Sequence, residues 1–338
     1  MNVPGPPKSP VLVTGAGGFI GSTLCRALVE AGCEVRGLDL PGTGSRGLEK
    51  IGVRLFEGDI CRPDSLAEPF TGVATVFHLA ALARDWGKRS LFMAINAGGT
   101  KNALDAAAAA GVRRFAHMSS LAIHSFSGHH DADESTPAGN HINGYCSSKI
   151  AAEKIVQDAQ AAGKFETTII RPGAIIHGPG DTTAFTQLAA FLEKSKMMLV
   201  GGGCQLTCYS YAENLVRGMI MAAASPAGAG ETFILTDDLR ISVRDYMTAV
   251  CRALGLPAEF TSIPAPLARA GGWTFEMLWK LAGAKNPPIV HRYRVGLVAR
   301  DFHFCCEKAK RVLGYSPKIP FEEGLASTAR WYLDRRRG

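Results

Sequence analysis

The sequence lacks the features that would indicate a membrane-spanning, secreted or zinc-binding protein. None of its 338 residues lies in an apolar run that approaches the roughly 18–20 residues of a membrane span. Residues 1–10 are rich in proline and contain no hydrophobic stretch typical of a signal peptide. The nine cysteines form no CxxC pair and need no disulfide. We therefore expect a cytoplasmic protein with no transmembrane segment and no metal site.

Strong charge is also missing. Charged residues make up 20% of the chain, and the formal net charge is only +7. Part of this excess lies in the tail Arg335-Arg336-Arg337, which we interpret as a solvated terminus. We expect no nucleic-acid partner, although a positive surface would help to collect an anionic cofactor or substrate. The hydrophobic fraction of 46% is enough for a packed core.

Short apolar runs alternate with helical patterns through the first half of the chain. The predicted strands are residues 11–14, 34–38, 53–56, 75–79, 112–118 and 167–170, and the predicted helices include residues 90–110 and 146–162. This alternation is typical of α/β proteins with right-handed crossovers. The pattern predicts a Rossmann-type, doubly wound parallel sheet.

The rhythm changes after about Gly178, where helical patterns and loops rich in glycine and proline dominate. We divide the chain into a dinucleotide-binding domain, residues 1–177, and a smaller, mostly helical substrate lobe, residues 178–338. Residues 231–236 are predicted to return to the main sheet as one more strand. Residues 183–198 and 265–281 are predicted helices of the lobe.

A glycine-rich loop joins the first predicted strand to the first helix, with the sequence Thr14-Gly-Ala-Gly-Gly-Phe-Ile-Gly21. Gly15 permits a tight turn, Gly18 lets the backbone approach a pyrophosphate, and Gly21 lets the helix pack closely on the strand. The helix N-terminus then offers free N–H groups to phosphates. The strand before the loop and the helix after it are the context that this motif requires.

Asp39 ends the second predicted strand, where a carboxylate can accept hydrogen bonds from both hydroxyls of the adenosine ribose. The same carboxylate would repel a 2′-phosphate, so we expect NAD rather than NADP. Arg36 and Arg46 lie close in sequence and leave NADP open.

Tyr145 and Lys149 stand four residues apart at the start of a predicted helix, so their side chains share one face. A free phenol has a pKa near ~10, and a neighbouring ammonium would lower that pKa. Such a phenol can act as a base in alcohol oxidation and as an acid in ketone reduction. Ser119 and Ser120 follow the fifth strand, at the sheet edge where these folds bind ligands. One of them can donate to a substrate oxygen, while strand-end capping is the alternative role.

Together these motifs resemble the extended short-chain dehydrogenase/reductase superfamily, which includes the NAD-dependent epimerases and dehydratases. The resemblance covers nearly the whole chain. Besides the glycine loop and the Tyr145–Lys149 pair, it rests on Gly58-Asp59-Ile60, His78-Leu-Ala-Ala81, Asn96 with Gly99-Thr100-Lys-Asn102, and the segment Arg171-Pro-Gly-Ala-Ile-Ile-His-Gly-Pro-Gly180.

The resemblance implies specific site residues. The catalytic residues would be Ser120, Tyr145 and Lys149, with Ser119 as second choice for Ser120. The cofactor would be held by Gly15, Gly18, Phe19, Ile20, Gly21, Asp39, Asp59, Ile60, Leu79, Ala80, Ala81, Asn96, Ser119, Tyr145, Lys149, Pro172, Ala174 and Ile175.

Within the superfamily the chain is most similar to the 3β-hydroxysteroid dehydrogenase group, which includes sterol-4-carboxylate 3-dehydrogenases and 2-alkyl-3-oxoalkanoate reductases. The supporting segments are Ala81 to Gly87 and Phe302 to Glu323. His177 stands where the group usually has Tyr, Cys305 where it often has Asp or Ser, and Ala212 where Val is usual. These departures weaken assignment to one subgroup.

The resemblance implies an NAD(P)-dependent oxidoreductase acting on a secondary alcohol or ketone of an apolar small molecule. A 3β-hydroxysteroid or sterol comes first and a long-chain 3-oxo acid second. Apolar residues of the lobe suit such a body: Phe185, Leu188, Phe191, Leu192, Met197 and Met198. One alternative is a nucleotide-sugar epimerase or dehydratase, for which Arg217, Arg292 and Arg294 would serve. Another is a non-enzymatic NAD-sensing protein. A homodimer also stays open.

Two further features have a plain and a functional interpretation. A histidine- and aspartate-rich stretch, His124 to Asp133, would suit a metal, but a polar loop over the substrate is the preferred interpretation. Trp273 to Trp279 would suit a membrane or lipid, but ordinary core packing of an amphipathic helix is preferred.

Overall fold

A computed structural model describes residues 5–43, 47–284 and 286–337. Its centre is a seven-stranded parallel sheet in the order β11-β7-β5-β4-β1-β2-β3. The chain starts in the middle of the sheet, moves to one edge and then crosses to the other, which is the predicted doubly wound topology. The strands are β1 (Val11–Thr14), β2 (Val35–Asp39), β3 (Arg54–Glu57), β4 (Thr75–His78), β5 (Arg114–Met118), β7 (Glu166–Pro172) and β11 (Glu231–Leu235).

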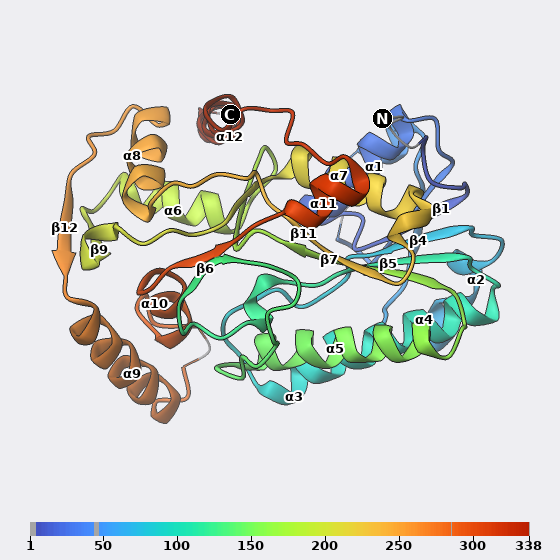
Figure 1. Ribbon diagram of the computed structural model, residues 1–338, viewed down its shortest axis with the longest axis horizontal. Coiled ribbons are helices and arrows are strands. Elements are labelled where there is room, and N and C mark those ends of the chain that lie inside the picture. The colour runs from blue at the N-terminus through green and yellow to red at the C-terminus, as the bar shows by residue number, and fades with distance from the viewer. Residues whose placement is uncertain (1–4, 44–46, 285, 338) are drawn as a thin grey trace.

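Helices cover both faces of the sheet (Figure 1). On one face α1 (Phe19–Glu30), α7 (Ala212–Ala224) and α11 (Glu307–Leu313) pack against a core that includes Val13, Phe77 and Phe233. On the other face, the core draws on side chains of α2 (Ala67–Phe70), α4 (Gly99–Ala109) and α5 (Gly144–Ala161). Both cores are built from the short apolar runs of the strands, and the central strands β1, β4 and β5 are buried on both sides as parallel strands require.

The predicted helix 90–110 is one continuous helical rod with a wider turn in its middle. It consists of α3 (Arg89–Phe92), a π-helical segment (Met93–Gly98) and α4. The helix begins one residue before the predicted start. π-helical turns are rare and frequently occur at functional sites, and here the wider turn contains Asn96.

The smaller lobe stands at the carboxyl end of the sheet and contains more strands than the sequence predicted. Three pairs of short parallel strands join distant segments: β8 (Ile175–His177) with β10 (Tyr209–Tyr211), β9 (Met197–Val200) with β12 (Phe260–Ile263), and β6 (His129–Ala132) with β13 (Phe302–Phe304). The remaining helices are α6 (Ala184–Leu192), α8 (Val243–Ala253), α9 (Ala265–Leu281), α10 (Arg292–Val298) and α12 (Phe321–Arg337).

The predicted helix over residues 183–198 is therefore wrong at its end. Helix α6 stops at Leu192, and Met197–Val200 pairs with Phe260–Ile263 instead. Strand β11, by contrast, lies beside β7, with Phe233 opposite Ile170. Between β7 and β11 the chain passes through α6 and α7 before it returns to the sheet.

Candidate active site

The glycine-rich loop has the close backbone contacts that its sequence predicted. Gly15 has a φ of +72°, and a Cβ there would lie 3.0 Å from the backbone of Ala80. A Cβ on Gly21 would lie 2.0 Å from the carbonyl oxygen of Gly15. A side chain at either position would collide with backbone atoms, so the loop can hold this shape only with glycine.

Helix α1 begins at Phe19, directly after the loop, and no side chain caps its N-terminus. The N–H groups of Phe19, Ile20 and Gly21 have no acceptor within the helix. The first turn contains no acidic residue. These free donors and the positive end of the helix dipole make a site for an anion, so the residues present fit the pyrophosphate of NAD.

Asp39 ends β2 directly beside this loop. One of its carboxylate oxygens accepts a hydrogen bond from Gly17 N at 2.7 Å. Arg36 is one of the two arginines that left NADP as a possible cofactor. It donates to the Thr71 carbonyl oxygen at 2.7 Å and lies 3.7 Å from Glu34. Arg46 lies outside the described residues. The acidic side chain therefore stands at the loop while Arg36 is held elsewhere.

The parallel sheet brings the other predicted cofactor contacts to the same edge. Asp59 lies just beyond β3, Leu79 to Ala81 follow β4, Ser119 follows β5, and Pro172 is the last residue of β7. Ile60 packs against Gly99, where a Cβ would lie 2.5 Å from its side chain. Ala174 and Ile175 continue from Pro172, and Ile175 begins β8.

Asn96 connects this edge to the helix that contains Tyr145. Its amide oxygen accepts from Leu82 N at 2.7 Å, and its amide nitrogen donates to Ser148 Oγ at 2.9 Å. Ser148 in turn donates to the Tyr145 carbonyl oxygen at 2.8 Å. These bonds hold the loop after β4 at a fixed position relative to α5.

Tyr145, Lys149 and Ser120 meet where β5 ends and α5 begins. Asn143 caps α5, its side chain accepting from Cys146 N at 2.9 Å. Lys149 is buried, and its Nζ donates to the Met118 carbonyl oxygen at 2.8 Å. The Ser120 side chain hydrogen-bonds to Tyr145.

Burial dominates the electrostatics of Lys149 and Tyr145. It lowers the pKa of Lys149 to about 8, and the nearby Glu153 carboxylate opposes this shift. Desolvation raises the pKa of the Tyr145 phenol, with the Ser120 hydrogen bond acting in the opposite direction. The expected lowering of the Tyr145 pKa is therefore wrong for the protein without cofactor, because loss of water around the phenol outweighs the Ser120 hydrogen bond.

The two serines differ in their surroundings. Ser120 Oγ accepts from Ala122 N at 3.1 Å, so Ser120 caps a short turn as well as contacting Tyr145. Ser119 is buried, and its hydroxyl has no partner among the described residues. A buried hydroxyl without a partner is costly, so Ser119 fits a position that hydrogen-bonds a bound cofactor.

Glu153 lies one turn beyond Lys149 and is itself held by a buried ion pair. Arg171 donates to its two carboxylate oxygens at 2.9 and 2.8 Å, and both side chains are almost fully buried. Arg171 comes from β7, so this fork fixes α5 against the sheet.

A pocket of about 660 Å³ lies beside the start of α5. Asn143 and Gly144, the two residues before Tyr145, form part of its wall. Its other walls come from the loop after β4, α3, the loop before α5, α9, the loop after α9 and α10: Asp85, Trp86, Gly87, Lys88, Arg89, Phe92, His141, Ile142, Glu276, Lys280, Gly283, Ala284, His291 and Tyr293.

The sequence analysis missed Tyr293 and His291, because no motif marks them, and it gave no role to Asp85, which lies in the segment Ala81 to Gly87. Burial raises the pKa of Tyr293 well above its usual value, and the nearby Tyr145 phenol adds to the shift. Burial would raise the pKa of Asp85, but hydrogen bonds from His291 and Arg294 outweigh it and hold the pKa at about 2. Only the fold brings these residues, some two hundred positions apart, to one wall.

The apolar residues expected to line the substrate site mostly form the core of the lobe. Phe185 is buried there, and Leu188, Leu192 and Met197 pack against it. Met198 is 56% exposed. Apolar walls of the pocket come instead from Trp86, Phe92 and Ile142.

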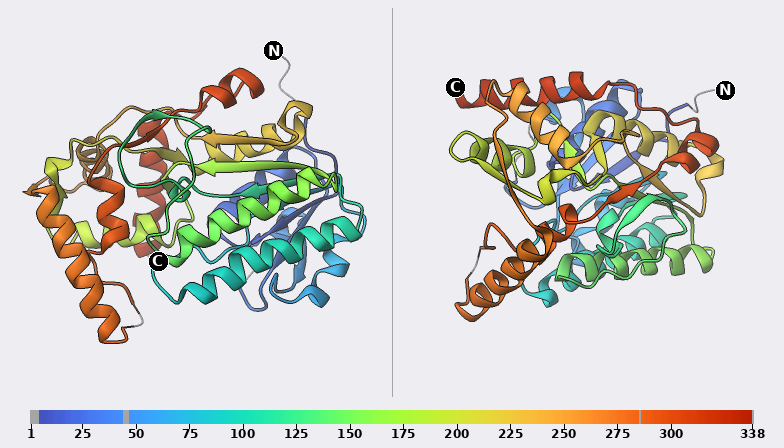
Figure 2. Two further views of the ribbon diagram at one scale, coloured as in Figure 1. Left: turned by 60° about the horizontal axis from the view of Figure 1, so that its bottom comes forward. Right: turned by 60° about the vertical axis from the view of Figure 1, so that its left-hand side comes forward.

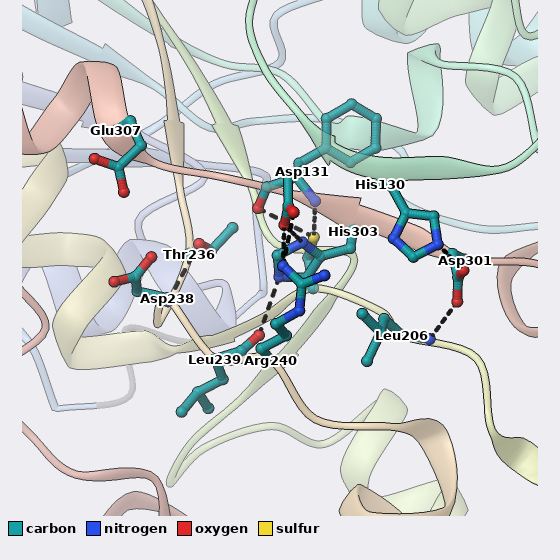
Figure 3. A network of polar contacts seen from close by, with 12 residues as sticks. His130, Asp131, Leu206, Thr236, Asp238, Leu239, Arg240, Asp301, His303 and Glu307 are labelled. Carbon is teal, nitrogen blue, oxygen red and sulfur yellow. Dashed lines mark hydrogen bonds and ion pairs between the residues drawn. The ribbon is translucent and has the colours of Figure 1, made fainter.

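Hydrogen bonds and ion pairs connect the histidine-rich stretch before α5 to residues of the C-terminal lobe. Asp131 accepts two hydrogen bonds from Arg240, at 2.8 and 2.6 Å, and lies 2.9 Å from His303 of β13 (Figure 3). His130 lies 2.5 Å from Asp301, which accepts from Leu206 N. Within the described ranges, no three His, Cys, Asp or Glu side chains are placed to hold a metal ion.

Comparison with known proteins gives one family and several relatives. Residues 11–235 match the NAD dependent epimerase/dehydratase family. The chain is 30% identical to a 2-alkyl-3-oxoalkanoate reductase of Shewanella oneidensis, over 94% of this chain and 84% of that protein. It is 32% identical to the 4-hydroxy-2-methyl-3-oxo-4-farnesyl-3,4-dihydroquinoline-1-oxide ketoreductase of Stigmatella aurantiaca, over 93% of each.

A 3 beta-hydroxysteroid dehydrogenase/Delta 5→4-isomerase of Mycobacterium tuberculosis is also 30% identical, over 96% of this chain and 90% of that protein. Among solved structures, gox2253 superposes with a TM-score of 0.82 at 27% identity, covering 97% of this chain and 98% of that one.

Proposed function

Because the chain belongs to the NAD-dependent epimerase/dehydratase family, within the extended short-chain dehydrogenase/reductases, we propose that it interconverts a secondary alcohol and a ketone on a large, mainly apolar substrate. A 3β-hydroxysteroid or sterol is the first candidate. The observation that carries the proposal is the meeting of Tyr145, Ser120 and Lys149 beside a pocket with aromatic walls.

NAD, when bound at the glycine loop, would accept or supply the hydride. The chain itself would manage the proton and the substrate oxygen. In the reducing direction Tyr145 would donate its phenolic proton to that oxygen, and Ser120 would hold the oxygen through its hydroxyl. Lys149 would stabilise the phenolate that remains, since its ammonium lies on the same helix face.

The pKa of Lys149 sets a limit on this mechanism. With a pKa of about 8, the lysine is protonated below that pH and loses its charge above it. The stabilisation of the phenolate is then lost, so we expect kcat for ketone reduction to fall above about pH 8.

Two observations bear on the substrate. Trp86, Phe92 and Ile142 would cover an apolar body, with each buried methylene worth about 0.8 kcal/mol. Lys88 and Arg89 are exposed at the same pocket and have no carboxylate partner in the described part of the chain. These two cations support a long-chain 3-oxo acid, the second candidate, because the carboxylate of such a substrate would need a cation.

The nucleotide-sugar alternative has less support in the lobe. Two of the three arginines considered for it are neutralised, Arg292 by Glu276 and Arg294 by Asp85. An NAD-sensing protein without activity would not need the buried Lys149 and its contact to β5.

The test is the absorbance of reduced cofactor with a panel of hydroxysteroids, long-chain 3-oxo acids and nucleotide sugars, with NAD and NADP in separate assays. We expect turnover of one of the first two classes and a higher kcat/KM with NAD, because Asp39 stands at the loop. Turnover of nucleotide sugars alone, with the cofactor retained, would replace this proposal with the epimerase function.

A further inference from the structure

Helix α9 exposes the large apolar side chains that a helix of a globular protein normally buries. Its buried line consists of Ala268, Gly272 and Glu276, at successive intervals of four. Gly272 packs against α10, where a Cβ would lie 3.2 Å from Val295. The contact with the rest of the lobe is therefore made by small residues and one carboxylate.

The large residues of α9 point to solvent instead. Of the twelve large apolar side chains that the described residues leave exposed, eight lie between positions 267 and 290: Leu267, Trp273, Phe275, Leu278, Trp279, Leu281, Ile289 and Val290. Leu267, Leu278 and Leu281 share one helix face with Thr274, at intervals of seven, four and three. Core packing, the preferred interpretation of Trp273 to Trp279, is wrong, because Trp273 is 55% and Leu278 52% exposed.

The helix also stands away from the body of the protein. In both views of Figure 2, α9 projects from the edge of the lobe, away from the sheet and the helices that cover it. Monomeric proteins rarely leave such a contiguous apolar surface free. In the described part of the chain, no helix is both long and apolar enough to cross a membrane.

The charges around this face are mainly positive. Among the described residues of 265–294, the basic side chains are Arg269, Lys280, Arg292 and Arg294 and the one acid is Glu276, while Asp85 pairs with Arg294 from outside this range. Glu276 is buried and binds Lys280 at 2.6 Å and Arg292 at 2.6 Å. Hydrogen bonds from these two bases outweigh burial and hold its pKa at about 2, so it stays ionised and neutralises part of their charge. In the described part of residues 265–294 no exposed carboxylate opposes an anionic surface, and Asp85 is engaged by Arg294.

We propose that α9 docks this protein on the surface of a bilayer that contains anionic lipid. The apolar face of α9 enters the region between headgroups and acyl chains, and the basic residues contact the phosphates. Tryptophans at positions 273 and 279 suit this interfacial depth. A second copy of the chain is the weaker partner, because two such faces would bring like charges together.

The docking places the pocket at the membrane. Gly283 and Ala284, at the C-terminal end of α9, form part of the pocket wall, and Trp86 Nε1 donates to the Ala284 carbonyl oxygen at 3.0 Å. If the proposed function holds, a sterol or long acyl chain passes from the bilayer into the pocket without crossing water. The docking itself does not depend on the reaction.

The test is co-sedimentation of the full-length protein with vesicles of phosphatidylcholine alone and with added phosphatidylglycerol. We expect binding to the anionic vesicles that weakens in high salt. The variant Leu278→Ser/Leu281→Ser should bind them roughly 100-fold less, since it removes two exposed leucines from the face. The matched control is Ile51→Ser/Met198→Ser, which removes exposed apolar side chains elsewhere and should bind like the wild type.

Tryptophan fluorescence gives a second readout. Trp273 and Trp279 should shift to shorter wavelength on vesicle addition and be quenched by brominated lipid, and Trp273→Phe should reduce that quenching. Equal vesicle binding by wild type and the leucine variant would overturn the proposal. So would a dimer in solution that the leucine variant converts to monomer, because the partner would then be a second copy. Either result leaves the NAD-dependent activity to be judged by its own assay.

Discussion

Helices α5 and α9 are almost equal in length, with 18 and 17 residues, but they use burial in opposite ways. Helix α5 buries polar side chains, among them Ser148, Lys149 and Glu153, and gives each a partner. Helix α9 exposes leucine and tryptophan and buries mainly small residues. Burying a charge is expensive unless it is paired, so it is expected where a side chain must be held for chemistry. Exposed apolar surface is expected where the partner is another body.

The largest expected effect tests the chemistry at the start of α5. We expect Tyr145→Phe to lower kcat by about 10²- to 10⁴-fold, because the positioned proton donor is lost. The fold and NAD affinity should persist, since the ring stays in place. Turnover is measured by reduced-cofactor absorbance. Tyr332→Phe, in α12, is the control and should keep its activity. Normal turnover in folded Tyr145→Phe would remove this residue from the mechanism.

The buried charge pair behind Lys149 gives the next effect. Glu153→Gln leaves Arg171 buried without a countercharge, which should lower the free energy of unfolding by about 3–5 kcal/mol. Glu153 also raises the pKa of Lys149, so without it the loss of activity on the alkaline side should begin at a lower pH.

Denaturant unfolding and a pH–rate profile measure the two consequences of this substitution. Asp158→Asn breaks an exposed pair on the same helix and serves as the control, with a change below about 0.5 kcal/mol. An unmoved pH profile in a destabilised Glu153→Gln would mean that the pair is structural alone.

A buried histidine gives a smaller effect that depends on pH. His177 packs among Tyr211, Tyr246 and Phe321, and burial lowers its pKa to about 4. Between these pH values the imidazole is protonated in the unfolded chain but stays neutral in the folded chain. The free energy of unfolding therefore falls as pH drops from about 6.5 towards 4. His177→Phe removes this contribution and should be stabilised by about 2 kcal/mol at pH 5, relative to the difference between the two proteins at pH 8.

Thermal or urea unfolding at the two pH values measures the His177→Phe effect, and pH 8 provides the internal reference for altered packing. A difference between the proteins that does not change with pH would show that His177 is not held neutral in the folded state.

The smallest expected effect is on α9 in solution. Leu278→Ala should change the free energy of unfolding by less than about 0.5 kcal/mol, because the side chain is already exposed. Leu104→Ala, at a buried position of α4, should cost about 2–5 kcal/mol in the same measurement. A large loss of stability for Leu278→Ala would show that the α9 face is covered in solution. The contrast with α5 would then no longer hold.

The sequence predicted the large sheet within one or two residues at most strand ends, because each buried strand is a short apolar run between turn signals. The pairs β8–β10 and β9–β12 could not be predicted in this way. Segments such as Tyr209–Tyr211 are too short to show a period, and their partners are far away in sequence.

Helix α9 was predicted with its exact bounds, residues 265–281, but with the wrong environment. A periodic pattern shows which residues share a face, and it does not show whether the fold provides an element to cover that face. The same limit applies to Tyr145. Its spacing to Lys149 was visible in the sequence, whereas the desolvation that raises the pKa of its phenol depends on the fold and was not.

The return of β11 to the sheet has a consequence for the order in which the protein is made. The core between the sheet and helices α1, α7 and α11 depends on residues from α7 and β11, such as Val216 and Phe233, and on Leu313 from α11. When only the nucleotide-binding half has emerged from the ribosome, the sheet therefore has a bare edge at β7, and α1 alone covers one of its faces. The glycine loop and the Tyr145 helix emerge early, but the nascent chain can complete their support only when its last third has been synthesised.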